Sequence, residues 1–180
     1  MARVLFLYSS FYGQARKVCE RLQSRLAERG HAADVVSIAE PGPDPAGYDA
    51  IVIGASIRHG KHNPAVMEFI NKHRALLDAK PSAFFSVSLV ARKPGKDTAE
   101  TNPYSKAFLA RSPWKPKAAA VFGGVLDYQR YGLFDRYVIR LIMTINKGPT
   151  DLYTAHEFTN WDRVDEFAGQ LSALLPGSAT

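Results

Sequence analysis

The residues with the clearest chemical meaning follow the first apolar segment of the chain, residues 3–8. Directly after it the sequence reads SSFYGQA and continues into a segment with helical periodicity. The start of a helix offers unpaired N–H groups and the positive end of its dipole, and both suit a phosphate group. Hydroxyl groups add donors, and a glycine lets the backbone approach closely. We therefore predict a phosphate-binding loop formed by Ser9, Ser10, Phe11, Tyr12, Gly13, Gln14 and Ala15.

The composition of this loop limits which cofactor it can hold. It contains no lysine, so it lacks the charge of a Walker-type nucleotide site, and it lacks the G-x-G-x-x-G pattern of dinucleotide sites. What is left is a binding site for a single phosphate group. Such a site fits FMN, whereas the loop shows no evident binding site for FAD or NAD. The alternative is an ordinary serine-rich cap on a strand-to-helix turn, and the loop alone leaves that alternative open.

Two later loops are candidates for the surroundings of a flavin ring. Residues 54–62 read GASIRHGKH and follow the third apolar segment. Their small residues permit backbone hydrogen bonds to the ring edge, and Ile57 or His59 can pack on a ring face. Residues 86–91 follow the fourth apolar segment and carry side chains that can surround the ring. In these loops we assign cofactor binding to Ala55, Ser56, Ile57, Ser86, Val87, Ser88, Leu89, Val90 and Ala91.

The remaining histidine and thiol groups suggest no metal centre. His59 and His62 form an H-x-x-H motif, but no carboxylate or thiol ligand stands near them in the sequence. We assign no metal ligand and expect both histidines to face solvent or substrate. His73 occupies an inward helical position and is expected to be a packing histidine. Cys19 lies on the apolar stripe of its helix, and we expect an inert core thiol.

Basic residues follow directly after the loop at residues 86–91. Residues 92–117 hold seven basic side chains against two acidic ones, and the whole chain carries a formal charge of +6. Such a patch favours an anionic partner, which could be a nucleic acid, lipid headgroups or a carboxylated substrate; solvated surface charge is the alternative. Arg92 can hold a carboxylate through two parallel hydrogen bonds, while Lys93 acts more as a point charge.

The elements that must position these loops alternate between strand and helix. Short apolar runs without helical period predict strands, and periodic segments between them predict helices, one begun by Asn63-Pro64 and the last by a capping box at residues 159–162. This alternation predicts a doubly wound α/β fold with a five-stranded parallel sheet and ligands at the carboxyl ends of its strands. With the loop after the first strand, the chain resembles the flavodoxin-like fold, and this resemblance implies the strand order 2-1-3-4-5. The predicted strands are residues 3–8, 33–37, 49–54, 82–88 and 118–125.

A long connection before the last helix interrupts this plan, at about residues 127–152 of a single domain. Residues 133–147 have helical period with apolar side chains around most of the circumference. Such a helix either enters the core or meets lipid or a hydrophobic ligand, and we favour the second because the fold is complete without it. Residues 153–159 read as a return to strand, so we expect the insertion to split the fifth strand.

From the bulk properties of the chain we expect a cytoplasmic protein. Its 180 residues fit one domain with a single core. Cys19 is the only thiol, which excludes an internal disulfide and suits a reducing compartment. The apolar run at the N-terminus is too short for a signal peptide, and no apolar stretch approaches the roughly 18 residues of a spanning helix.

Together these motifs resemble one family, the menaquinone-dependent protoporphyrinogen IX dehydrogenases, which are flavodoxin-like enzymes of haem biosynthesis. The resemblance extends from the first strand to about residue 175 and rests on VIGASIRHG, SAFFSVSLVARKP, TNPYSKAFL and LFDRYVIRLIM. It implies FMN as the cofactor and oxidation of protoporphyrinogen IX to protoporphyrin IX, with menaquinone or ubiquinone as the electron acceptor. It also implies an enzyme peripherally bound to the anionic cytoplasmic surface of the inner membrane, with no nucleic-acid partner.

The same resemblance suggests which residues meet the substrate, while the flavin itself carries the chemistry and no catalytic residue is assigned. Arg58, Arg92 and Lys93 are candidates for the two propionates, and Tyr128, Arg136 and Arg140 are candidates in the insertion. Three other functions stay open. An electron-transfer flavodoxin is one, although such proteins are typically acidic and this chain is basic. The others are an NAD(P)H:quinone reductase and a regulatory domain without a cofactor.

Overall fold

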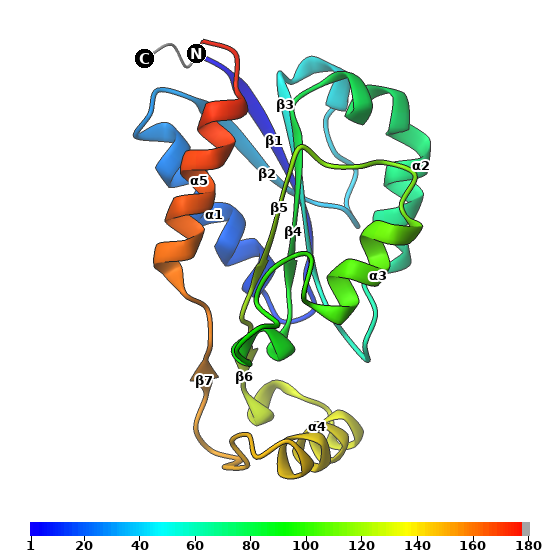
Figure 1. Cartoon of the computed structure of the whole chain (residues 1–180), viewed down its shortest axis with the longest axis vertical. Helices are drawn as coiled ribbons and strands as arrows, with labels where there is room; N and C mark the ends of the chain where they lie inside the picture. Colours follow the sequence, from blue (N-terminus) through cyan, green and yellow to red (C-terminus); the bar gives the residue numbers. More distant parts are fainter. Residues whose placement is uncertain (178–180) are drawn as a thin grey trace.

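A five-stranded parallel sheet forms the centre of the protein in a computed structural model that describes residues 1–177 (Figure 1). The strand order is β2-β1-β3-β4-β5, so the predicted order is confirmed. β1 lies between β2 and β3 in parallel register, with Phe6 opposite both Val35 and Val52. The strands are β1 (Arg3–Ser9), β2 (Ala32–Ser37), β3 (Ala50–Ser56), β4 (Ser82–Val87) and β5 (Ala118–Phe122).

Helices cover both faces of this sheet (Figure 1). The helices α1 (Gln14–Ala27) and α5 (Trp161–Leu174) lie on one face, and α2 (Pro64–Ala79) and α3 (Pro103–Arg111) lie on the other. Two apolar layers result because successive strand residues point to opposite faces. Along β1, Phe6 packs in the layer beneath α1 and α5, and Leu5 packs in the layer beneath α2 and α3. Cys19 belongs to the first layer and is fully buried, as expected, and burial raises the pKa of its thiol.

Asparagine side chains cap three of the helices. Asn63 accepts a hydrogen bond from the N–H of Ala65, and Asn102 caps α3 in the same way. The predicted capping box at residues 159–162 is wrong, because Asn160 caps α5. The Thr159 hydroxyl instead donates to the carbonyl of Gly123 (2.6 Å), so it joins the incoming chain to the end of β5.

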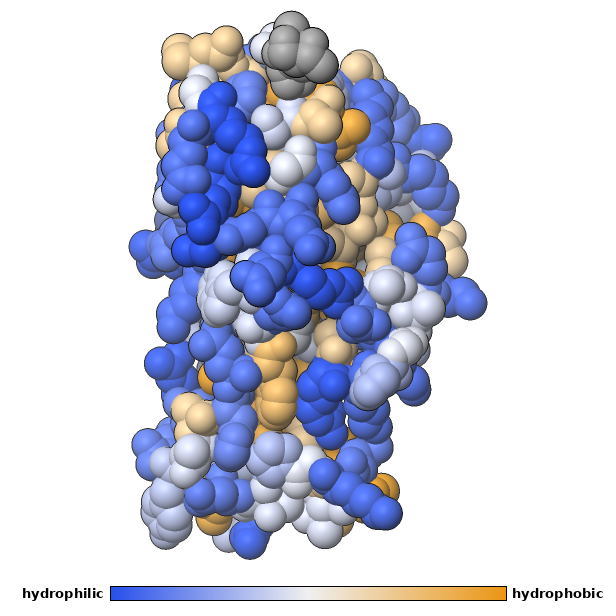
Figure 2. Space-filling view, turned by 60° about the vertical axis from the view of Figure 1, so that its left-hand side comes forward, coloured by the Kyte–Doolittle hydropathy of each residue, from blue (hydrophilic) through white to orange (hydrophobic). Residues whose placement is uncertain are grey.

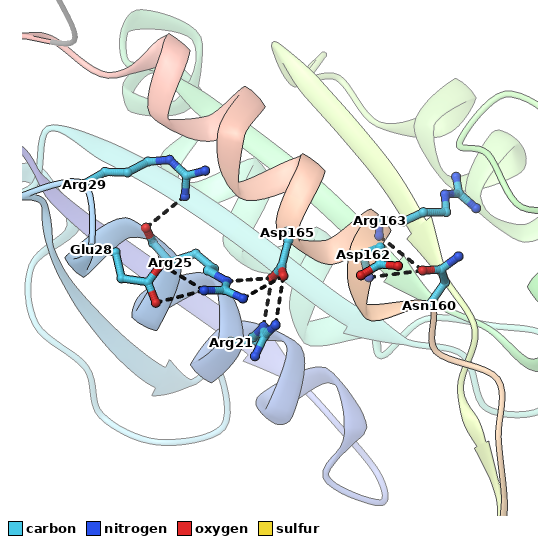
Figure 3. A network of polar contacts seen from close by, with 8 residues as sticks. All are labelled: Arg21, Arg25, Glu28, Arg29, Asn160, Asp162, Arg163 and Asp165. Atoms are coloured by element: carbon cyan, nitrogen blue, oxygen red, sulfur yellow. Dashed lines mark hydrogen bonds and ion pairs between the residues drawn. The ribbon is translucent and has the colours of Figure 1, made fainter.

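An ion-pair cluster joins α1 to α5 (Figure 3). Asp165 on α5 accepts hydrogen bonds from both Arg21 and Arg25 on α1, at 2.8 to 3.0 Å. Arg25 also pairs with Glu28. The two guanidinium groups hold the pKa of the Asp165 carboxyl well below its usual range. Figure 2 shows this side of the molecule, where hydrophilic side chains cover most of the surface around a small hydrophobic area.

The insertion lies beyond the carboxyl ends of the strands, at the opposite end of the molecule from the termini (Figure 1). After β5 the chain passes Gly123, where a Cβ atom would lie 2.2 Å from the Phe158 carbonyl oxygen, so only glycine allows this approach. The remaining elements are β6 (Val125–Leu126), α4 (Leu133–Ile145) and β7 (His156–Glu157).

The return to strand occurs as predicted, but its pairing differs from the prediction. β7 pairs antiparallel with β6 in a separate two-stranded ladder. The expectation that the insertion splits the fifth strand of the main sheet is therefore wrong in this detail. Gly123 and Gly124 end the pairing with β4 before the insertion begins, and β7 approaches β6 from the opposite direction.

A small core supports the insertion. Leu126, Tyr128, Tyr131 and Met143 are buried together. Most other apolar side chains of α4 are exposed, and among them Tyr137 is 67% and Ile145 is 71% exposed. Within residues 1–177, no helix has both the length and the apolar character needed to cross a bilayer.

Candidate functional site

A cleft of about 750 Å³ opens between the carboxyl ends of the central strands and α4. Its walls come from the loop after β1, the loop after β3, the segment after β4 and the inner side of α4. The carboxyl ends of parallel strands are where doubly wound folds bind ligands, and the volume is in the range of cofactor and small-molecule sites. The cleft is therefore the candidate functional site.

The loop after β1 contains a set of groups suited to an anion. The hydroxyl oxygen of Ser10 is hidden from solvent and has no hydrogen-bond partner among the described residues. Gly13 begins α1 in the left-handed conformation (φ 86°), and no side chain caps the first N–H groups of this helix. A buried, unpaired hydroxyl is costly unless a ligand completes it. These observations fit a phosphate group at the positive end of α1.

Ser56 at the end of β3 fixes the shape of that loop. Its hydroxyl accepts a hydrogen bond from the N–H of Phe11 and donates one to the carbonyl of Ser9, both at 3.3 Å. The loop after β1 is thereby bonded to the strand that carries the next wall of the cleft. The unpaired Ser10 hydroxyl thus sits in a preformed loop.

Apolar side chains form the middle of the cleft. Ile57 comes from the loop after β3, and its N–H donates to the carbonyl of Val87 at 2.9 Å. Leu89 and Val90 lie in the short helix Leu89–Arg92, which Ser88 caps by accepting a hydrogen bond from the N–H of Val90. This middle section can hold a flat apolar ring system beside the loop after β1.

The predicted cofactor residues divide into two groups by position. Those that line the cleft are Ser10, Phe11, Tyr12, Gln14, Ser56, Ile57, Val87, Ser88, Leu89 and Val90. Those that do not line it are Ser9, Gly13, Ala15, Ala55, Ser86 and Ala91. In the second group, the side chains of Ala15, Ala55 and Ser86 are fully buried in the protein. Gly13 contributes the left-handed backbone conformation at the start of α1.

His62 is a correction to the sequence-based expectation of a solvent- or substrate-facing residue. Its Nε2 lies 2.8 Å from the Ser86 hydroxyl, and its ring packs against Phe84 and Phe108. Burial, and then the nearby charge of Arg111, together lower the pKa of His62 to about 4. His62 is thus a neutral packing residue at neutral pH, and its ring nitrogen bonds the Ser86 hydroxyl, which the sequence predicts as a cofactor contact.

Asp135 of α4 is a charged residue of the cleft that the sequence analysis does not predict. Its carboxylate accepts a hydrogen bond from Arg58 Nη2 at 2.7 Å and lies 2.8 Å from His59 Nε2. The hydroxyl of Tyr12 donates to it at 3.4 Å. The Arg58 guanidinium, and then His59, hold the pKa of Asp135 below its ordinary value. The available signal was that Asp135 is the only acidic residue of this helix.

Two basic residues form the opposite rim of the cleft. Arg92 donates to the carbonyl of Leu89 at 3.1 Å, and Lys93 Nζ donates to Asn146 Oδ1 at 2.6 Å. Lys96 also lines the cleft. One cleft therefore holds the three residues predicted to meet carboxylates, which are Arg58, Arg92 and Lys93. Arg58 lies on the other side of the cleft, where its guanidinium carbon is 5.1 Å from the centre of the Phe11 ring.

The three predicted substrate residues of the insertion lie outside the cleft. Tyr128 is fully buried, and its hydroxyl donates to the carbonyl of Pro149 at 2.7 Å. Arg136 donates to the carbonyl of Tyr128 at 2.9 Å, so both residues brace α4. Arg140 is exposed on the outer side of the helix. The helical period placed these residues on α4 or next to it, but it did not show which side of the helix faces the sheet.

Comparisons with known proteins agree with this fold. The model of the flavodoxin domain family matches residues 5–153. Protoporphyrinogen IX dehydrogenase (quinone) of Escherichia coli strain K12 is 43% identical over 173 residues, 96% of each chain. The Leishmania major protein of the same name is 39% identical and covers 96% of this chain and 75% of its own.

Solved structures show the same fold at low sequence identity. Oxidised Flavodoxin 1 from Bacillus cereus superposes with a TM-score of 0.55 at 12% identity, over 97% of this chain and 99% of that one. Flavodoxin 2 from the same organism gives a TM-score of 0.54 at 15% identity over 96% and 99%. The flavodoxin structures thus share the fold of this chain, and the dehydrogenases share its sequence over almost the whole length. This chain belongs to the flavodoxin-domain family and, within it, to the protoporphyrinogen IX dehydrogenase (quinone) family.

Proposed function

We propose that this protein oxidises protoporphyrinogen IX to protoporphyrin IX in haem biosynthesis, with FMN as its cofactor and menaquinone or ubiquinone as the electron acceptor. The observation that carries the proposal is the 43% identity, over 96% of both chains, to a protein with that activity in its name. The cleft supports it, because a phosphate loop, an apolar middle and a cationic rim occur in one space.

The loop after β1 would hold the phosphate of FMN. Ser10 has a free hydroxyl for it, and the uncapped N–H groups of α1 supply further donors. Ile57, Leu89 and Val90 would pack around the ring. FMN, when bound, supplies two-electron redox chemistry that amino-acid side chains cannot supply. The protein contributes position, exclusion of water and electrostatics.

The cationic rim would orient the substrate. Protoporphyrinogen IX is an apolar macrocycle with two propionate groups, and Arg92, Lys93 and Lys96 stand at the edge of the apolar middle of the cleft. Carboxylates pair with such cations while the macrocycle stays among the apolar residues. Tyr128 and Arg136 lie outside the cleft and would support α4 without contacting the substrate.

The exposed side of α4 would bring the cleft to a lipid surface on the cytoplasmic side of the inner membrane. Leu133, Tyr137, Leu141 and Ile145 are all more than half exposed on one side of this helix. An amphipathic helix of this kind lies in the headgroup region, and a nearby cation such as Arg140 favours anionic lipids. Quinones reside in the same membrane, so this placement would give the acceptor access to the cleft.

One experiment separates this function from its alternatives. The purified chain, reconstituted with FMN, is mixed with protoporphyrinogen IX and a soluble quinone, or with NADPH and the same quinone. We expect porphyrin formation in the first mixture and negligible turnover in the second. Rapid turnover with NADPH alone would indicate an NAD(P)H:quinone reductase. A flavin that exchanges electrons with redox proteins but leaves protoporphyrinogen untouched would indicate an electron-transfer flavodoxin. A chain that does not bind FMN would indicate a regulatory domain.

A further inference from the structure

The contact between Asp135 and the cleft wall joins a loosely packed helix, α4, to loops of the firmly packed central sheet. Its donors, Arg58, His59 and Tyr12, follow β3 and β1 in the central sheet. Its acceptor lies in the first turn of α4, where Gly132 provides no side-chain cap. Of the α4 residues, only Asp135 and Met143 are buried. An element with so few buried contacts can move at low cost compared with the strands.

The three donors form a seat with the shape and charge that a carboxylate requires. Both oxygens of Asp135 are used, one by Arg58 and Tyr12 and the other by His59. His59 (φ 50°) and Gly60 (φ 76°) form a two-residue turn between Arg58 and Lys61, whose backbone groups exchange hydrogen bonds in both directions at 2.9 and 3.0 Å. This tight turn fixes the backbone that carries Arg58 and His59.

Exchange of one carboxylate for another at this seat keeps the charges balanced. Removing Asp135 alone would leave the Arg58 guanidinium without its partner in a cleft with several other cations, which is unfavourable. A carboxylate on a ligand can accept the hydrogen bonds that Arg58, His59 and Tyr12 otherwise donate to Asp135. The opposite rim carries Arg92 and Lys93, so a ligand with two carboxylates can meet cations on both sides of the cleft.

We propose that Arg58, His59 and Tyr12 form a carboxylate-binding subsite which Asp135 occupies in this structure, and that a substrate carboxylate binds there by displacing Asp135 and releasing α4. This inference rests on the proposed function, since it assigns one propionate of the porphyrinogen to the subsite. Asp135 is in this account an internal competitor that closes the cleft, and not a residue that contacts the substrate.

The test compares protoporphyrin IX with its dimethyl ester, which has the same macrocycle without carboxylates. Binding of each compound to the full chain in excess FMN is measured by equilibrium dialysis in the same detergent. The variants are Asp135→Asn, which cannot pair with Arg58 as an anion, and Arg58→Ala, which removes the seat. We expect Asp135→Asn to tighten binding of the free acid by at least about threefold, because no internal carboxylate competes. We expect Arg58→Ala to weaken it by about tenfold, and the ester to change by less than about twofold in both variants.

Amide hydrogen exchange in α4 provides a second measurement that does not depend on the variants. The free acid should speed exchange in α4 of the wild-type protein, and the dimethyl ester should not. Weaker binding of the free acid to Asp135→Asn, or equal effects on acid and ester, would overturn the inference while leaving the proposed function intact. Failure of both compounds to bind any variant or the wild type would overturn the proposed function as well.

Discussion

Ser10 is the residue whose chemistry depends most directly on a ligand. Its buried hydroxyl has no partner within the described part of the chain, so it destabilises the ligand-free protein and would stabilise a complex with phosphate. Ser10→Ala should therefore weaken FMN binding by about ten- to a hundredfold, which corresponds to roughly 1–3 kcal/mol, without lowering the stability of the ligand-free protein. Fluorescence titration with FMN and denaturant unfolding measure the two effects.

The matched control for this change is Ser24→Ala, which removes an exposed hydroxyl from α1 itself. It should leave FMN affinity unchanged. Substitution of Gly13 would be a poorer test, because φ of 86° strains any other residue whether or not a ligand binds. Equal FMN affinity in Ser10→Ala and the parent protein would remove Ser10 from the phosphate site.

His62 should make the protein less stable in mild acid. Its pKa in the folded protein is about 4, against 6.5 for an ordinary histidine, so between these values the unfolded chain binds a proton that the folded chain does not. The free energy of unfolding should therefore fall as pH falls from about 6.5 to about 4, by up to about 3 kcal/mol from this residue. In His62→Gln this part of the pH dependence should disappear.

Urea unfolding at several pH values measures the change, and NMR titration of the His62 ring gives its pKa directly. A ring that titrates at pH 6.5 or above in the folded protein would contradict the account of His62 as a neutral packing residue beside Ser86. Stability profiles of equal slope for His62→Gln and the parent protein would do the same.

At the scale of elements, the pairing of α1 with α5 depends on Asp165. This carboxylate is 26% exposed and bonds to two arginines, which makes it stronger than an isolated surface pair. Asp165→Asn should lower the free energy of unfolding by about 1–3 kcal/mol, and less at high salt. The control is Glu20→Gln, which breaks the more exposed Arg16–Glu20 pair and should cost less than about 0.5 kcal/mol. A loss no larger than that of the control would show that Asp165 does not hold the helices together.

The exposed side of α4 should be the part of the molecule that binds lipid. Replacing Leu141 and Ile145 together by serine removes two apolar side chains that are 61% and 71% exposed, so folding should be unaffected. Binding to vesicles that contain anionic lipid should fall by about tenfold or more, because each buried apolar side chain contributes about 1.5–3 kcal/mol. Vesicle sedimentation measures this, with circular dichroism to confirm the fold. Undiminished sedimentation would assign the lipid contact to another surface or to none.

At the scale of the whole molecule, the sequence predicts the sheet and the position of the cleft well. Strands such as β1 are continuous apolar runs, and the strand-to-helix turn at Gly13 has clear local signals, so both could be read from neighbouring residues. The pairing of β7 could not, because it depends on the close approach of Gly123 to Phe158, which are distant in the sequence.

The same distinction holds within the site. Arg92 and Lys93 were found because they follow a predicted strand directly, and they do line the cleft. Asp135 was missed because its role arises from contacts with Arg58 and His59, more than seventy residues earlier. Helical period identified α4 as amphipathic, but it could not tell which part of its circumference would face the cleft and which would face outward.

The central claim is that the whole molecule couples oxidation of protoporphyrinogen IX to reduction of a quinone through FMN. Its most direct test is an anaerobic assay of the FMN-reconstituted protein with protoporphyrinogen IX and a soluble menaquinone analogue, in which porphyrin absorbance and quinone consumption are recorded together. We predict that porphyrin forms only when protein, FMN and quinone are all present, that quinone is consumed in proportion, and that Ser10→Ala is slow at limiting FMN and recovers in excess FMN. Porphyrin formation that is independent of FMN, or no porphyrin formation by a yellow, folded protein, would contradict the account.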